Sequence, residues 1–163
     1  MKTLIVYCSR YGTAAECART LAQKVGEETR VADLAREPRT SVEGADVVLI
    51  GGSIYGGKIQ RPVVTFCERN RGALLAVKVG LYLCCLFTGE EAAVQMQSAF
   101  PDWLLAHAFG RALPGGRIRF ERLSFLDRLL LRGLAHAPGD LSRLRPEALD
   151  ELADATRAAV GKA

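Results

Sequence analysis

The sequence lacks the features of membrane-spanning and secreted proteins. No segment approaches the roughly 18 consecutive apolar residues that a transmembrane helix needs, and the amino terminus has no charged, apolar and cleavable leader. We therefore expect a cytoplasmic protein. Its 163 residues are enough for one domain with a substantial hydrophobic core, and we predict a single domain over residues 1–163.

The cysteine pattern does not predict a disulfide framework or a metal site. The five cysteines are odd in number and contain no C-x-x-C pair, and only two histidines accompany them. We interpret Cys17, Cys67 and the others as buried thiols that behave as small hydrophobes. A redox role for Cys8 and the Cys84–Cys85 pair, which lie near predicted strand ends, is the weaker alternative.

Several functional motifs are also absent. The chain has neither the G-x-G-x-x-G dinucleotide fingerprint nor the G-x-x-x-x-G-K-[ST] loop of nucleoside triphosphatases. No Ser/His/Asp or Cys/His arrangement is recognisable, so we assign no catalytic side chain. No nucleic-acid-binding motif accompanies the basic residues, and we expect no nucleic-acid partner.

What the chain does have is an abrupt change from strand to helix near its start. Residues Thr3–Tyr7 form an uncharged apolar run that is typical of a strand buried on both faces. Cys8 to Gly12 follow, and Thr13 with Glu16 predicts a capping box that begins a helix. A helix start of this kind exposes unpaired backbone N–H groups and binds anions, most naturally a phosphate. An ordinary strand-to-helix turn remains the alternative.

A second glycine-bearing segment follows another buried strand. Residues 46–52 predict that strand, and Gly51 to Gly57 read G-G-S-I-Y-G-G. We interpret these residues as a ligand loop at the same edge of the sheet. The alternative is that the glycines only permit positive φ in a tight turn.

Strands and helices alternate along most of the chain, which predicts an α/β fold. Further strands are expected at residues 30–34, 77–87 and 104–113, and helices at residues 61–70, 91–100 and 146–160. A short helix is an alternative within residues 104–113. We expect a doubly wound, five-stranded parallel sheet with strand order 2-1-3-4-5 and helices on both faces. This order places ligands at the carboxyl ends of strands one and three.

Residues 114–135 form a basic amphipathic segment. Residues 111–132 contain six arginines and two acidic residues, so this segment has a net charge of +4, which equals the formal net charge of the whole chain. We predict an amphipathic helix over residues 123–134 and a loop over residues 135–145. A solvated basic face is one interpretation; the other is contact with anionic lipid, tetrapyrrole carboxylates or an acidic redox partner.

The two glycine-bearing loops together resemble those of the flavodoxin family. Ser9 and Gly12 match its [ST]-x-[ST]-G-x-[ST] phosphate loop, whereas Tyr11 and Ala14 replace two hydroxyl residues. Gly51, Ser53, Tyr55 and Gly56 match its G-x-S-x-[WY]-G segment. The resemblance implies a flavodoxin-like fold and an FMN cofactor. The cofactor-binding residues that it implies are Ser9, Arg10, Tyr11, Gly12, Thr13, Ala14, Ser53, Ile54, Tyr55, Gly56, Gly57, Leu86, Phe87, Thr88 and Gly89.

The last third of the chain resembles the flavodoxin-like, quinone-dependent protoporphyrinogen dehydrogenases. The matching residues are Gly115-Gly116, Arg119-Phe120 and Phe125-Leu126-Asp127-Arg128. This resemblance implies an FMN-dependent dehydrogenase of haem biosynthesis, with a porphyrinogen substrate and a quinone or protein redox partner. It also implies peripheral contact of residues 117–134 with the inner face of the membrane.

Two other functions fit the same loops. One is a flavodoxin-type electron carrier without its own substrate; the other is a flavodoxin-like scaffold without flavin. Carriers of this family are typically acidic, whereas here Arg10, Lys58 and Arg61 flank the predicted cofactor loops. Positive charge stabilises a reduced, anionic flavin, so we expect a reduction potential above that of acidic flavodoxins. The oligomeric state does not follow from the sequence.

Overall fold

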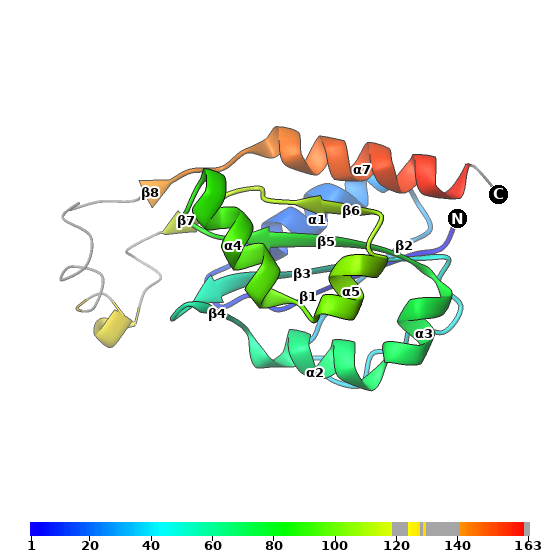
Figure 1. Ribbon diagram of the computed structural model, residues 1–163, viewed down its shortest axis with the longest axis horizontal. Helices are drawn as coiled ribbons and strands as arrows, with labels where there is room; N and C mark the ends of the chain where they lie inside the picture. The colour runs from blue at the N-terminus through cyan, green and yellow to red at the C-terminus, as the bar shows by residue number, and fades with distance from the viewer. Residues whose placement is uncertain (119–123, 128, 130–140, 162–163) are drawn as a thin grey trace.

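The computed structural model describes residues 1–118, 124–127, 129 and 141–161 (Figure 1). Its centre is a parallel sheet with strand order β2-β1-β3-β5-β6. This is the predicted doubly wound order, counted over the five parallel strands. The strands are β1 (Thr3–Tyr7), β2 (Thr29–Asp33), β3 (Val47–Tyr55), β5 (Lys78–Cys84) and β6 (Gly110–Ala112).

The central strands are buried on both faces, as their continuous apolar sequences predict. In β3, Val47 to Ile50 are fully buried, and β5 is buried from Val79 to Cys84. The parallel register pairs Thr3 with Val47 and Val47 with Lys78, so the three strands begin level with one another. Their carboxyl ends therefore meet at one rim of the sheet, where the two predicted ligand loops lie.

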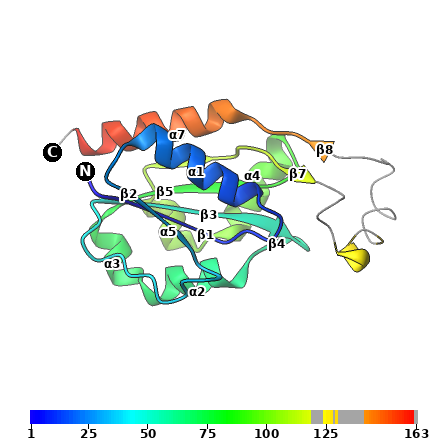
Figure 2. The same cartoon turned by 180° about the vertical axis from the view of Figure 1, so that it is seen from behind.

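Helices cover both faces of the sheet (Figures 1 and 2). The helices α1 (Thr13–Val25) and α7 (Pro146–Val160) pack side by side on one face, around a core that includes Leu21, Leu49 and Leu152. The opposite face is covered by α2 (Arg61–Arg69), α3 (Arg71–Ala76), α4 (Gly89–Ala99) and α5 (Asp102–His107). Within the described ranges, no helix is both long and apolar enough to cross a bilayer.

Three predicted strands have different bounds in the structure. The strand expected at residues 77–87 ends at Cys84. Residues 104–113 were expected to form one strand, but residues 102–107 are helix α5 and only Gly110–Ala112 pair with β5. The alanines of this segment allow a helix, and Pro101 at the N-cap begins it. The third strand continues past Gly52 to Tyr55, and a turn at Gly56-Gly57 returns the chain as β4 (Lys58–Ile59), antiparallel to β3.

The last third also departs from expectation where it is described. Residues 135–145 were predicted to be a loop, but β8 (Leu141–Ser142) pairs antiparallel with β7 (Arg117–Ile118). Of the predicted helix over residues 123–134, residues 125–127 and 129 are helical, and the other residues, apart from Ser124, lie outside the described part. Arg119-Phe120 and Arg128 of the matched motifs also lie outside it.

Candidate functional site

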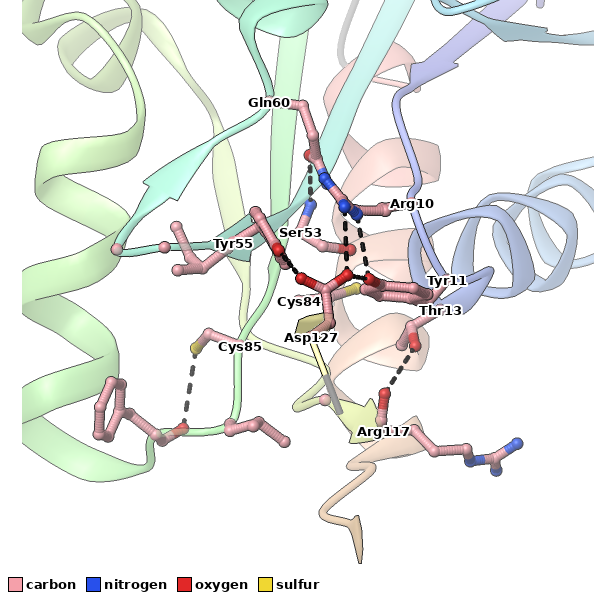
Figure 3. Close-up of a pocket in the computed structure, with 16 residues that line it drawn as sticks. Arg10, Tyr11, Thr13, Ser53, Tyr55, Gln60, Cys84, Cys85, Arg117 and Asp127 are labelled. Atoms are coloured by element: carbon pink, nitrogen blue, oxygen red, sulfur yellow. Dashed lines mark hydrogen bonds and ion pairs between the residues drawn. The ribbon is translucent and has the colours of Figure 1, made fainter. Parts of the chain in front are cut away.

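The two predicted loops lie beside each other at the carboxyl rim of the sheet, and a cavity of about 500 Å³ opens between them (Figure 3). Small-molecule sites typically span roughly 300–1,000 Å³. Ten of the predicted residues line the cavity: Arg10, Tyr11, Thr13, Ser53, Ile54, Tyr55, Gly56, Gly57, Leu86 and Phe87. Five do not, namely Ser9, Gly12, Ala14, Thr88 and Gly89.

The first loop ends in a left-handed glycine at the start of α1. Gly12 has φ 95° and is the N-cap, and its N–H donates to Ser9 Oγ at 3.0 Å. Helix α1 begins at Thr13 as predicted, but the predicted capping box is wrong. Thr13 Oγ1 instead donates to the carbonyl of Arg117 at 3.3 Å, and in the part of the chain that the structure describes the N-cap Gly12 makes no side-chain capping bond. Uncapped first-turn N–H groups at the positive end of a helix dipole favour an anion.

The second loop is a β-hairpin rather than an irregular loop. Gly56 and Gly57 have φ 56° and 77°, so the interpretation that glycine permits positive φ is right for these two positions. Gly51 serves packing instead, because a Cβ atom there would lie 1.9 Å from Cζ of Tyr82. The extended hairpin holds the Tyr55 side chain at the cavity, 39% exposed.

Gln60 follows the hairpin and lines the same cavity, which sequence reasoning missed. Its Oε1 accepts from the backbone N–H of Ser53 at 2.9 Å. Its Nε2 is buried and has no hydrogen-bond partner in the described part of the chain. Because an unpaired buried donor is costly, this amide suits a ligand acceptor at the cavity. The sequence offers one general signal for this position of Gln60, namely that polar residues just after a strand tend to lie at the carboxyl edge of the sheet.

Asp127 reaches the cavity from the basic segment and binds side chains of both loops (Figure 3). Its carboxylate is buried, with 5% exposure, and accepts from the Tyr11 and Tyr55 hydroxyls. Arg10 Nη2 also donates to it at 3.1 Å, and Ser124 Oγ donates at 2.7 Å. No signal in the sequence joins Asp127 to Tyr55, which lies 72 residues earlier.

Arg10 packs on the ring that was expected to stack on a flavin. The guanidinium lies 4.2 Å from the Tyr55 ring centroid, within the range of a cation–π contact. Arg10 and Asp127 therefore fill part of the rim between the loops. A planar ligand that stacks on Tyr55 must displace Arg10 and loosen its ion pair with Asp127.

The third side of the cavity comes from the end of β5 and from the strand β7. Cys84, Cys85 and the following Leu86 and Phe87 contribute on one side, and Gly116 and Arg117 on the other. Burial raises the pKa of the Cys85 thiol, whose Sγ donates to the carbonyl of Phe87 at 3.7 Å. The cavity residues that were not among the predicted cofactor-binding residues are Gln60, Cys84, Cys85, Gly116, Arg117 and Asp127. Of these, the sequence had indicated only the Cys84–Cys85 pair, as thiols near a strand end.

A doubly wound parallel sheet with an anion-binding helix start and an aromatic hairpin at one rim defines a class of mononucleotide-binding α/β proteins. Comparison with known proteins specifies the family. The flavodoxin domain family matches residues 4–142. The chain belongs to the flavodoxin family, and this membership supports FMN, the cofactor that the two loops predict.

Individual relatives agree with this assignment. The chain is 25% identical over 155 residues to the protoporphyrinogen IX dehydrogenase [quinone] of Escherichia coli K12, covering 90% of this chain and 86% of that protein. A WrbA-like flavodoxin from Agrobacterium tumefaciens has a TM-score of 0.57 at 14% identity, over 96% of this chain and 98% of that one. A Streptococcus pneumonia TIGR4 flavodoxin has a TM-score of 0.55 at 15% identity, over the full length of both chains. The structural likeness shows the fold.

Proposed function

We propose that this flavodoxin-family protein is an FMN-dependent dehydrogenase that oxidises a reduced organic donor and passes the electrons to a quinone, with a porphyrinogen as candidate donor. One observation carries the proposal: the likeness to a protoporphyrinogen dehydrogenase extends over 90% of the chain. Bound FMN would supply the hydride acceptor and the electron transfer.

The cavity and the adjoining start of α1 fit FMN in three ways. The left-handed Gly12 and the uncapped start of α1 suit its phosphate. The unpartnered Gln60 amide suits a polar atom at the edge of the flavin ring. Tyr55 offers an aromatic face once Arg10 leaves it, and Arg10 then has its guanidinium free for the phosphate.

The charge at this rim supports a quinone as electron acceptor. Arg10 and Arg117 line the cavity, and Lys58 and Arg61 directly follow the lining residues Gly57 and Gln60 in the sequence. Among the described lining residues, Asp127 is the one carboxylate. A cation near a developing flavin anion stabilises it by about 1 kcal/mol at contact in water, and by more where water is excluded. We expect a reduction potential above that of acidic flavodoxins, which spectroelectrochemistry measures.

The segment next to the cavity offers an apolar surface for peripheral membrane contact. Phe125, Leu126 and Leu129 are 81%, 69% and 60% exposed, and Asp127 on the same turn points into the cavity. We propose that these three residues contact the surface of an anionic membrane. A lipid-soluble quinone would be available there. Replacing the three with Ser should weaken sedimentation with anionic vesicles; unchanged sedimentation would favour a solvated surface.

A flavodoxin-type electron carrier is the second candidate. The observation that favours it is the absence of a recognisable catalytic arrangement in the sequence, together with the overall likeness to flavodoxins. A carrier would show FMN reduction and oxidation by protein partners but no turnover of a small donor.

Two measurements test these candidates in order. The absorbance of the purified protein, or of the protein after addition of FMN, first reports whether flavin binds. A turnover assay with protoporphyrinogen and a menaquinone analogue then runs beside a simple quinone reductase assay. We expect FMN-dependent oxidation of the porphyrinogen. Quinone reduction without porphyrinogen oxidation would overturn that substrate, and failure to bind FMN at high micromolar concentration would overturn the whole proposal.

A further inference from the structure

Two buried cysteines from distant parts of the chain meet beside the cavity. Cys17 lies in the second turn of α1, and Cys84 is the last residue of β5. Their Sγ atoms are 3.6 Å apart, and the two residues are only 4% and 3% exposed. Both belong to the core between the sheet and helices α1 and α7. The contact joins residues 67 positions apart, so it is a product of the fold.

The geometry is close to that of a cystine. A disulfide has an S–S length of about 2.05 Å, so the two sulfurs need to approach by roughly 1.5 Å. Cys84 is held by its strand, where its register partner on β3 is Ser53. Cys17 lies near the amino-terminal end of α1, so rotation of its side chain and a small shift of that end can supply the approach.

The local electrostatics divide the pair into two roles. The hydrogen bond from the Cys84 thiol lowers the pKa of Cys17, and the Arg117 guanidinium acts in the same direction, against burial and Glu16. The same hydrogen bond, together with burial, raises the pKa of Cys84 well above its ordinary value. We assign the nucleophilic role to Cys17, because it borders a second cavity and its lowered pKa favours the reactive thiolate.

Each thiol also borders a different cavity. Cys84 lines the cofactor cavity, whereas Cys17 lines a separate cavity of about 110 Å³ between α1 and the start of α7, near Thr13, Thr20 and Leu149. That volume exceeds the roughly 30 Å³ share of a water molecule in the liquid, so the cavity has room for a small hydroperoxide beside Cys17.

We propose that Cys17 and Cys84 are a redox-active thiol pair that a hydroperoxide oxidises to an intramolecular disulfide in the wall of the cofactor cavity. Cys17 attacks the peroxide; an S–O bond forms, the O–O bond breaks, and the leaving oxygen departs as water. The Cys84 sulfur then displaces the oxygen from Cys17, which leaves as a second water and takes up the remaining proton. Two thiols and one hydrogen peroxide give one disulfide and two waters, and a dithiol reverses the oxidation by exchange.

A consequence for the cofactor rests on the proposed function. Drawing α1 and the end of β5 together moves the first turn of the phosphate-binding helix and the residue beside Ser53. We expect the disulfide form to bind FMN several-fold more weakly than the dithiol form, which would couple flavin loading to peroxide.

Thiol counting on the full-length protein tests the pair independently of flavin. After stoichiometric hydrogen peroxide, denaturation and iodoacetamide, mass spectrometry should show alkylatable cysteines falling from five to three. Digestion without reductant should give a Cys17–Cys84 cross-linked peptide, and dithiothreitol should restore all five thiols. Retention of five thiols, or a cross-link between other cysteines, would overturn the proposal.

Variants separate the two roles. In Cys84→Ser, Cys17 should stop at a sulfenic acid that dimedone traps; in Cys17→Ser, peroxide should leave Cys84 reduced. Cys67→Ser is the matched control, because burial raises the pKa of that thiol to about 12 and the variant should still lose two thiols. Cys→Ala versions at both positions replace any serine variant that circular dichroism shows to be unfolded.

FMN titration of the oxidised and reduced protein tests only the coupling between the disulfide and cofactor binding. If neither form binds FMN, the proposed function fails, but the thiol counts still decide whether the cysteine pair is redox-active.

Discussion

The segments Cys8–Ala14 and Gly51–Gly57, here called the first and second loops, carry similar sequence signals, namely hydroxyl residues with glycines, but they form different structures. The first turns through the left-handed Gly12 into a helix and presents backbone N–H groups. The second continues as strand to Tyr55 and reverses at Gly56-Gly57, presenting an aromatic side chain. One loop is suited to charge and the other to a flat ring. The difference shows that the ligand surface of a glycine-bearing segment depends on whether a helix or a returning strand comes next in the chain.

Tyr82, a buried residue of β5, contacts both loops. Its ring fills the space over Gly51, and its hydroxyl donates to the carbonyl of Ala14 at 3.2 Å. Its side chain is fully buried, which raises its pKa well above the ordinary value. The relative position of the helix start and the hairpin therefore depends on one core side chain of β5.

The largest expected effect comes from filling the space that Tyr82 occupies. Gly51→Ala places a Cβ atom 1.9 Å from the Tyr82 ring, which cannot move without disturbing the core. We expect a loss of about 3 kcal/mol in the free energy of unfolding, measured by urea denaturation. Gly72→Ala is the control, because it lies in helix α3 with open space around it and should be neutral or slightly stabilising. A neutral Gly51→Ala would show that the two loops are not linked through Tyr82.

The next effect separates the loops by backbone strain. Gly12→Ala forces a Cβ atom into the left-handed region at φ 95°, at a cost of about 1–2 kcal/mol. We expect weaker FMN binding together with this loss of stability, because the strained residue begins the helix that we propose to bind the phosphate. Isothermal titration and urea denaturation of the same samples measure both. Unchanged FMN affinity in a destabilised variant would remove the first loop from the site.

A smaller effect tests the aromatic surface of the second loop. Tyr55→Ala should weaken FMN binding by roughly fivefold, since aromatic stacking contributes about 0.5–1.5 kcal/mol. Tyr55→Phe keeps the ring and removes only the hydrogen bond to Asp127, so we expect nearly unchanged affinity. Quenching of flavin fluorescence measures both variants. Equal losses in the two would indicate that the hydroxyl, rather than the ring, is the contact.

The smallest effect concerns the carboxylate that joins the loops. Asp127→Asn removes the ion pair that holds Arg10 on the Tyr55 ring. Arg10 should then leave the ring more easily, which favours FMN. Because an ion pair with a half-exposed guanidinium contributes little free energy, we expect FMN affinity to rise by only about threefold. Asp150→Asn is the charge-matched control, because Asp150 pairs with Lys24 at the other end of α1. Weaker FMN binding in Asp127→Asn would instead make this carboxylate part of the binding surface.

Much of the fold and part of the site followed from the sequence. The apolar runs located β1, β3 and β5, and the 3.6-residue periodicity located α1 and α7, because burial patterns are local properties of a strand or helix. The α5–β6 boundary was missed, since Trp103 to Leu113 satisfies either element. The capping box was also wrong, because Thr13 bonds to Arg117, a residue that no local rule associates with it.

The sequence by itself determined which segments form the central strands and the helices α1 and α7, and its two glycine-bearing motifs indicated the family, because periodicity and short motifs depend on neighbouring residues. The tertiary structure alone decided that Gln60 faces the cavity, that Asp127 binds both loops, and that Cys17 meets Cys84. These contacts join residues that are distant along the chain or face different ways from their neighbours. Only the packing of helices and loops against the sheet brings such side chains together.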